Sequence, residues 1–393
     1  MKYFHRRKTA RFGLRAKNKL FDLNKILFNP DWFLVGLIFG IIIFGLIMLA
    51  SASSVESFRR YGGTYMILWR QFSRGFIPGL FFFIILARID YRRWEKNTVL
   101  FFIVSVVMLL LVFIPGIGST YGKGSHSWIN IFGISIQPAE VVKLFLIMSL
   151  AGWFSYRGHE RNSDFWNGLV PFGIIFGAIS LLVVMQPDVG TLMVLTAIAI
   201  SVYFLAGARF SHLALLGLGG ICGVIVLLFS ATYRLKRLLT FIDPSLDPQN
   251  AGYQINQALI AVGSGGWFGL GFGQSRQKFA YLPEVIGDSI FAVISEEIGF
   301  IFACAIVFAF LLLAWRGFKI YQGINDDYGK YVVAGIIIWF VFQAFFNIAA
   351  IIGLMPLTGL TLPFISYGGT SLAATMAAAG ILVNISSQIQ KSK

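Results

Sequence analysis

Apolar segments long enough to cross a lipid bilayer are the feature that most constrains the fold of this chain. A window of about 19 residues, which spans the hydrocarbon layer as a helix, selects about ten such segments in the 393 residues. They lie near 32–53, 72–87, 97–115, 137–154, 166–186, 188–206, 211–231, 288–314, 331–352 and 368–387. The sequence therefore predicts an all-α fold, a polytopic membrane helical bundle of about ten transmembrane helices. The run 72–87 is the weakest, because it is short and Pro78 interrupts it.

The composition and charge agree with a membrane protein. Hydrophobic residues make up 57% of the chain and charged residues only 12%, whereas soluble domains carry about 25% charged residues. The net charge of +15 would suggest a nucleic-acid partner in a soluble protein, but nine basic residues fall within the first 25 positions. That segment lacks the apolar stretch and cleavage site of a signal peptide. It predicts a retained cytoplasmic tail beside anionic membrane lipid, and no nucleic-acid partner.

The distribution of basic residues predicts the orientation in the membrane. With the amino terminus in the cytoplasm, cytoplasmic segments hold 21 of the 32 Lys and Arg residues, as the positive-inside rule requires. Both termini are then cytoplasmic. The predicted organisation is a basic tail at 1–31, a transmembrane domain at 32–387 and a second tail at 388–393.

A long loop at 232–287, between the seventh and eighth predicted spans, is the longest external segment in this orientation. Asp-Pro pairs at 243–244 and 247–248 are turn signals, and six glycines crowd positions 263–273. The segment is too apolar for a solvated linker and too broken to span. It is therefore expected to lie in the membrane interface or to fold back onto the bundle.

Three ionisable residues lie in or next to apolar segments, where a charge is costly and is a functional candidate. Glu140 and Lys143 are three positions apart on one helical face and can form an ion pair. The pair could bind helices together or form the polar wall of a substrate cavity. Asp188 follows a proline at a turn, and it could line the same cavity or cap the next helix.

The densest group of polar residues precedes the eighth predicted span. It comprises Gln274, Ser275, Arg276, Gln277, Lys278, Glu284, Asp288 and the pair Glu296 and Glu297. Cations at a helix entrance can bind phosphate oxygens, and a carboxylate beside them can act as a general base. Alternatively, this is a solvated helix start at which Asp288 is only the N-cap.

Arg234, Lys236 and Arg237 form a second basic cluster at the start of the same loop, and could bind substrate or only anchor the chain to lipid headgroups. The four histidines are scattered and no cysteine accompanies them, which argues against a zinc site. No dedicated metal cage is visible. Mg²⁺ or another divalent cation that bridges phosphates would need only one carboxylate.

These motifs together resemble the SEDS family (shape, elongation, division and sporulation), and within it the FtsW and SpoVE branch more than RodA. The similarity extends from the first span to residue 387. Its motifs are QPAEVVK (137–143), QPDVG (186–190), GYQ (252–254), GGWFG (265–269), GQSRQKFAYLPE (273–284), FAVISEEIG (291–299), PLTG (356–359) and LPFISYGG (362–369), which contains Ser366.

The resemblance implies a peptidoglycan glycosyltransferase that polymerises lipid II beside a class B penicillin-binding protein and other divisome proteins, at the division septum or in spore-cortex formation. It makes Asp288 the match of the family's essential aspartate. Substrate binding is assigned to Arg234, Arg237, Gln274, Arg276, Lys278, Glu284, Glu140, Lys143, Asp188 and Ser366. Two departures stand out: Ile286 and Gly287 replace a common His-Thr pair, and Ser127 replaces an arginine before Trp128.

The chemistry follows from the implied substrate. Lipid II, an undecaprenyl-pyrophosphate-linked disaccharide-pentapeptide, has an α-linked anomeric pyrophosphate, and the glycan product is β-1,4 linked, so one inverting displacement suffices. Asp288 would be the general base. Two other functions are a lipid II flippase and a non-catalytic scaffold of the division machinery. No inverted repeat supports the flippase, and a scaffold would not need a carboxylate at position 288.

Overall fold

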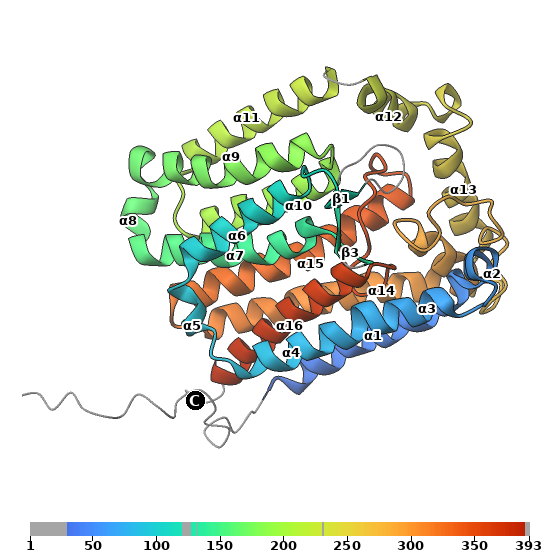
Figure 1. The fold of residues 1–393 in the computed structure, drawn as a ribbon, viewed down its shortest axis with the longest axis horizontal. Helices are drawn as coiled ribbons and strands as arrows, with labels where there is room; N and C mark the ends of the chain where they lie inside the picture. Colours follow the sequence, from blue (N-terminus) through green and yellow to red (C-terminus); the bar gives the residue numbers. More distant parts are fainter. Residues whose placement is uncertain (1–29, 120–126, 132, 230–231, 390–393) are drawn as a thin grey trace, which may run out of the picture.

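The structure is a computed structural model that describes residues 30–119, 127–131, 133–229 and 232–389. Most of the basic tail predicted at 1–31, and the last four residues of the chain, lie outside the described residues. Within the described part the fold is an all-α bundle, as predicted, in which most long helices run side by side (Figure 1).

The helices follow one another with short connections in most places. Up to the middle of the chain they are α1 (Trp32–Ala52), α2 (Ser54–Tyr61), α3 (Met66–Gln71), α4 (Ile77–Arg88), α5 (Arg92–Glu95), α6 (Thr98–Leu111), α7 (Pro138–Arg157), α8 (His159–Asn162) and α9 (Val170–Met185). The remainder are α10 (Val189–Leu205), α11 (Phe210–Phe229), α12 (Thr232–Ile242), α13 (Ala251–Ser264), α14 (Ile290–Gly323), α15 (Asp327–Ile351) and α16 (Gly369–Ile389). Two π-helical turns, η1 (Phe72–Phe76) and η2 (Phe165–Leu169), precede α4 and α9, and a 3₁₀ turn, η3 (Pro244–Leu246), follows α12.

Each predicted apolar run coincides with a helix. Seven helices of the described residues have the length and hydropathy of a membrane span, counting η2 and α9 as one. The helices α6 and α10 are shorter but apolar. The run 72–87 is also helical, as η1 followed by α4. Pro78 stands in the first turn of α4, where its missing N–H group is tolerated, and the preceding π turn accommodates the irregularity.

A small antiparallel sheet before α7 was not predicted from the sequence. Its strands are β1 (Gly118–Ser119), β2 (Trp128–Ile131) and β3 (Ile134–Ile136), in the order β1-β2-β3. Gly118 pairs with Ile129, which pairs in turn with Ile136. Strands this short leave almost no alternating pattern, so the hydropathy profile does not reveal them.

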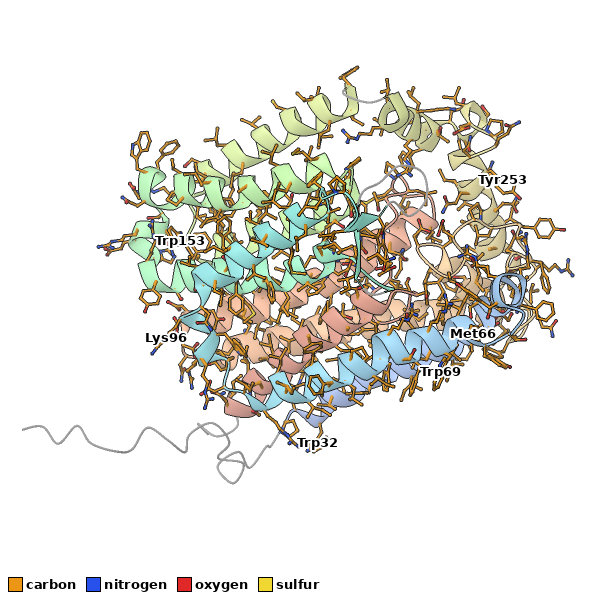
Figure 2. The ribbon with its side chains drawn as sticks, viewed as in Figure 1. Trp32, Met66, Trp69, Lys96, Trp153 and Tyr253 are labelled. Carbon is orange, nitrogen blue, oxygen red and sulfur yellow. The ribbon has the colours of Figure 1, made fainter. Side chains whose placement is uncertain are left out.

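The centre of the bundle is formed by α7, α15 and α16, which are the most buried of the candidate spans. Small residues allow close approach: a Cβ on Gly380 of α16 would lie 2.6 Å from the carbonyl oxygen of Phe83 in α4. In contrast, α11 lies at the periphery, where His212 is its only buried side chain. Side chains project along the whole bundle, with Lys96 and Trp153 at one end and Met66 and Tyr253 near the other (Figure 2).

The long loop folds back onto the bundle, which is the second of the two predicted alternatives. The backbone N–H groups of Leu270 and Gly271 donate to the carbonyls of Glu296 and Glu297 at 2.9 and 3.0 Å. These contacts interrupt α14 at Gly299, whose φ of 79° is left-handed. A Cβ at that position would lie 2.3 Å from the backbone nitrogen of Gly269, so a glycine is required there.

Candidate active site

Asp288 lies at the end of the long segment, just before α14. Ser289 is the residue at the N-cap position, and it makes no side-chain capping bond. The carboxylate of Asp288 accepts two long hydrogen bonds, from Gln254 Nε2 at 3.5 Å and from Ser289 Oγ at 3.4 Å. The interpretation of Asp288 as an N-cap is therefore wrong. Its carboxylate oxygens are weakly bound by the protein and available for another proton donor.

The electrostatic surroundings favour the protonated form of this carboxyl group. Burial and the nearby negative charge of Glu284 raise the pKa of Asp288 to about 7, although the Ser289 hydrogen bond and the positive charge of Arg237 act in the opposite direction. A carboxylate with a pKa near neutrality can accept a proton during a reaction and release it afterwards.

Three consecutive backbone carbonyls around Asp288 are each held by a donor from the C-terminal third of the chain. The carbonyl of Ile286 accepts from Tyr367 N at 2.8 Å, and that of Gly287 accepts from Ser366 Oγ at 2.7 Å. The carbonyl of Asp288 accepts from Asn347 Nδ2 at 2.8 Å. We call these donors the carbonyl clamp. They fix the peptide units that carry the Asp288 side chain.

Ser366 was predicted to bind substrate, and the structure gives its hydroxyl two protein partners. Besides donating to Gly287, Ser366 Oγ accepts from the backbone N–H of Leu362 at 2.8 Å. The side chain is buried. It therefore connects the LPFISYGG loop to the segment that precedes Asp288.

Asn347 was missed by the sequence analysis, although a signal was present. It lies within the apolar run 331–352, where an amide is expensive unless it is hydrogen-bonded. Its Nδ2 also donates to the carbonyl of Leu360 at 2.7 Å. One buried amide thus joins α15, the loop before α16 and Asp288.

The predicted group of cations before α14 divides into buried and exposed members. Lys278 is buried, and its Nζ contacts Glu297 Oε1 at 3.1 Å and Ser51 Oγ at 3.2 Å. The side chains of Gln274 and Arg276 are exposed. Because Glu297 already compensates the charge of Lys278, Arg276 is the more accessible cation of this group.

Glu296 organises the same turn through its carboxylate. It accepts from the backbone N–H groups of Arg276 at 3.0 Å and Gln277 at 3.4 Å, and from the hydroxyl of Ser275. Carboxylates that accept several backbone bonds fix a loop strongly. Glu296 therefore holds the 275–277 turn against α14, a role that the sequence did not indicate.

The basic cluster on α12 contributes a charge to the site. Arg237 is exposed, yet its positive charge lowers the pKa of Asp288 against the effect of burial. The side chain of Arg234 donates to the carbonyl of Leu227 at 3.2 Å. Of these two arginines, Arg237 is the one whose charge acts on the candidate base.

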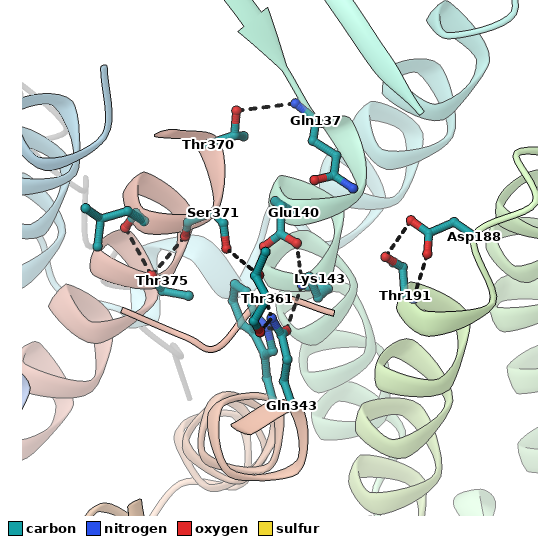
Figure 3. A network of polar contacts seen from close by, with 12 residues as sticks. Gln137, Glu140, Lys143, Asp188, Thr191, Gln343, Thr361, Thr370, Ser371 and Thr375 are labelled. Carbon is teal, nitrogen blue, oxygen red and sulfur yellow. Dashed lines mark hydrogen bonds and ion pairs between the residues drawn. The ribbon is translucent and has the colours of Figure 1, made fainter. Parts of the chain in front are cut away.

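Glu140 and Lys143 form the predicted ion pair, with Lys143 Nζ at 2.8 Å from Glu140 Oε1 (Figure 3). Lys143 also donates to Gln343 Oε1 at 2.9 Å, and it lies over the Trp339 ring. Gln343 in turn donates to the carbonyl of Thr361 at 2.9 Å. Gln343 and Asn347 are one helical turn apart on α15. Gln343, which contacts the ion pair, bonds Thr361, and Asn347 of the carbonyl clamp bonds the adjacent Leu360.

Asp188 caps α10, as one of its two interpretations predicted. Its carboxylate accepts from Thr191 N at 2.9 Å and from Thr191 Oγ1 at 2.7 Å (Figure 3). Both oxygens are used by the first turn of α10.

A cavity of about 390 Å³ opens between the α1–α2 junction and the segment 278–285. Its charged lining residues are Glu56, Arg59, Arg60, Lys278 and Glu284. Within the described residues, no group of three or more His, Cys, Asp or Glu side chains is placed to hold a metal ion.

A family model described as "Cell cycle protein", FtsW/RodA/SpoVE, matches residues 31–391. The chain belongs to this family. It is 43% identical over 359 residues to stage V sporulation protein E of Bacillus subtilis (strain 168), covering 91% of this chain and 97% of that protein. It is 37% identical over 347 residues to a probable peptidoglycan glycosyltransferase FtsW of Geobacter sp. (strain M18), covering 88% and 94%.

Solved structures of the FtsW/RodA/SpoVE family share this fold. The chain resembles a structure titled "Structural coordination of polymerization and crosslinking by a peptidoglycan synthase complex", with a TM-score of 0.75, 26% identity, and 91% and 97% of the two chains covered. It also resembles RodA of Thermus thermophilus, with a TM-score of 0.67 at 25% identity and the same coverage. With its apolar spans, this family member is an integral membrane protein.

Proposed function

We propose that this chain is a peptidoglycan glycosyltransferase that polymerises lipid II, with Asp288 as the general base. The observation that carries the assignment is the environment of the Asp288 carboxyl group. Its oxygens accept only long hydrogen bonds, and its pKa is raised to about 7. Its position is fixed by a hydrogen bond to its own backbone carbonyl. Curated relatives named as probable peptidoglycan glycosyltransferases support the reaction class.

The reaction would be one inverting displacement. Asp288 takes the proton of the acceptor's GlcNAc 4-hydroxyl as that oxygen attacks the anomeric carbon of the donor's MurNAc. The bond from that carbon to the pyrophosphate oxygen breaks, and undecaprenyl pyrophosphate leaves with the electron pair. The new bond is β-1,4 because attack occurs opposite the α-linked leaving group.

Fixed cations would stabilise the pyrophosphate as it leaves. Arg237 is the candidate on α12, because it is exposed and its charge acts on Asp288. Arg276 is the candidate on the long loop. A divalent cation bound with the substrate would supply positive charge for the same task.

We further propose that the chain works beside a class B penicillin-binding protein in division or sporulation, with both termini in the cytoplasm. The similarity to a chain from a peptidoglycan synthase complex supports a partner. The similarity to a sporulation protein and to FtsW supports septal or spore-cortex synthesis.

The decisive experiment incubates the purified chain with labelled lipid II, alone and with a class B partner, and separates the products by size. Glycan polymer that disappears in Asp288→Asn supports the proposal. A protein that moves lipid II across vesicle membranes and never forms polymer would instead be a flippase. If it does neither in the presence of its partner, it is a scaffold.

A further inference from the structure

The cavity between α2 and the segment 278–285 contains charges to which the catalytic proposal assigns no contact with the substrate. Arg60 is paired with Glu56, and Lys278 is paired with Glu297. This leaves Arg59 on α2 and Glu284 on the facing segment, the two charged lining residues for which the described part of the chain supplies no ion pair. A cation and a carboxylate therefore line one cavity without an ion-pair partner among the described residues.

The wall that carries Glu284 is held in an unusual backbone conformation. Ala280 and Glu284 both line the cavity and have positive φ angles, 68° and 51°, which cost free energy in residues other than glycine. The carbonyl of Glu284 accepts from Gly287 N at 3.0 Å and from Ser289 N at 3.2 Å. The turn that imposes the conformation thus fixes Glu284 relative to the residues on both sides of Asp288.

The cavity adjoins the reacting centre and is smaller than the whole substrate. Glu284 Oε2 would lie 3.6 Å from a Cβ at Gly287, the residue before Asp288. A volume of about 390 Å³ is at the lower end of small-molecule pockets. It suits one portion of a large substrate whose sugar is at Asp288.

The charges of the cavity distinguish between the portions of the substrate. A pyrophosphate needs several cations, but Arg60 and Lys278 are already paired with carboxylates. Arg59 would be its one unpaired cation among the described lining residues, and Glu284 would repel it. A neutral disaccharide could form hydrogen bonds with Arg59 and Glu284, but it would not neutralise their charges. A short peptide that has both carboxylates and an amino group matches this pattern of charges.

We propose that the cavity binds the peptide stem of the lipid-linked substrate, with Arg59 contacting a stem carboxylate and Glu284 contacting the amino group of the stem's diamino residue. This inference rests on the proposed glycosyltransferase function and adds a recognition subsite to it. The subsite adds binding energy for the substrate beside the 284–288 turn, and the orientation of the reacting sugar is left to the groups around Asp288.

The test compares two substrates in the full-length protein with its class B partner. One is lipid II with the complete pentapeptide, and the other is the same lipid-linked disaccharide without its peptide. With Arg59→Gln we expect KM for the pentapeptide substrate to rise about tenfold, as the loss of one charge-assisted contact predicts, and kcat to stay the same. KM for the peptide-free substrate should equal that of the wild type.

Two further measurements make the result specific. Free stem peptide should compete with lipid II in the wild type, and about tenfold more of it should be needed in Arg59→Gln. Acetylating the stem amine should raise KM in the wild type but not in Glu284→Gln. Lys96→Gln, at an exposed position on the opposite end of the bundle, is the control for loss of a positive charge and should leave both KM values unchanged.

Equal KM changes for the two substrates, or no change in Arg59→Gln, would overturn the inference and leave the glycosyltransferase assignment intact. Absence of polymer from every substrate in the wild type would instead overturn the proposed function. Arg59 is exposed, so an unchanged thermal unfolding midpoint is expected and separates binding from folding.

Discussion

Asn347 donates a hydrogen bond of 2.8 Å from its side-chain amide to the backbone carbonyl of Asp288. A residue near the C-terminal end of α15 therefore positions the peptide unit of the candidate base. The same amide nitrogen bonds the carbonyl of Leu360, so that one side chain fixes two segments far apart in the sequence.

Replacing Asn347 by alanine should lower kcat and leave KM nearly unchanged. The substitution leaves two carbonyls without this donor, at a cost of about 1–3 kcal/mol each in stability. Displacement of the Asp288 backbone should lower kcat on the order of 10²-fold, as small misplacements of reacting groups do. Rates with labelled lipid II and thermal unfolding in detergent measure both effects. Asn256→Ala, exposed on α13, is the control, and a wild-type kcat in Asn347→Ala would refute the positioning role.

Asp288→Asn should abolish most polymerisation while the protein stays folded. The amide preserves the size of the side chain but cannot accept a proton as a carboxylate does, so we expect a rate loss of about 10²–10⁴. Stability should change little, because the Asp288 side chain makes only long hydrogen bonds. The measurement is the rate of polymer formation, and binding of the partner protein is the control for folding. If Asp288→Asn polymerises lipid II at nearly the wild-type rate, Asp288 is not the general base.

The rate of polymerisation should rise with pH through about 7. Burial and Glu284 raise the pKa of Asp288 to about 7, so the carboxyl is protonated and inactive below that pH and ionised above it. Glu284→Gln removes a negative charge and should move the midpoint to lower pH. Arg237→Gln removes the opposing positive charge and should move it to higher pH. The measurement is kcat against pH, and midpoints that do not move in these directions would contradict the electrostatic account.

The ion pair of Glu140 and Lys143 is predicted to stabilise the bundle. Lys143→Met leaves a buried carboxylate without its cation, which should cost about 3–5 kcal/mol and lower the thermal unfolding midpoint. Adding Glu140→Gln removes that charge and should restore most of the stability. Lys96→Met, at an exposed position, is the matched control. A double variant that is stable but inactive would favour the alternative in which the pair forms the polar wall of a substrate cavity.

The orientation in the membrane can be tested with single cysteines. After Cys222 and Cys304 are replaced by alanine, Ser245→Cys in the long loop should react with an impermeant thiol reagent in whole cells. Ser392→Cys near the C-terminus should react only after the cells are broken. The opposite pattern would show that the positive-inside argument gave the wrong orientation.

The sequence predicted the helical elements well because the membrane leaves the backbone few choices. Every N–H and C=O in hydrocarbon must be bonded within the protein, so an apolar run such as 331–352 becomes a helix whatever its neighbours are. Pro78 was expected to weaken its run, but a π turn accommodates it. The cap at Asp188 and the pair of Glu140 with Lys143 were also predictable, because they involve residues three positions apart.

The candidate site was only partly predictable, because its essential contacts join distant parts of the chain. The sequence predicted that Asp288 stands beside cations, but it could not show that Lys278 is neutralised by Glu297. It grouped Ser366 with substrate-binding residues, which stays a prediction, but it could not show that the hydroxyl bonds Gly287. Neither contact leaves a pattern in local spacing.

Sequence alone thus determined the helices, their apolar character and the family motifs, since these follow from local hydropathy and from short runs of residues. Tertiary structure alone decided that Asn347, Ser366 and Tyr367 hold the carbonyls beside Asp288, and that Arg59 and Glu284 line the same cavity. The physical reason is that a hydrogen bond or a cavity wall depends on how helices pack together. Helix packing depends on side chains that many segments of the chain bury together, so it cannot be read from any one segment.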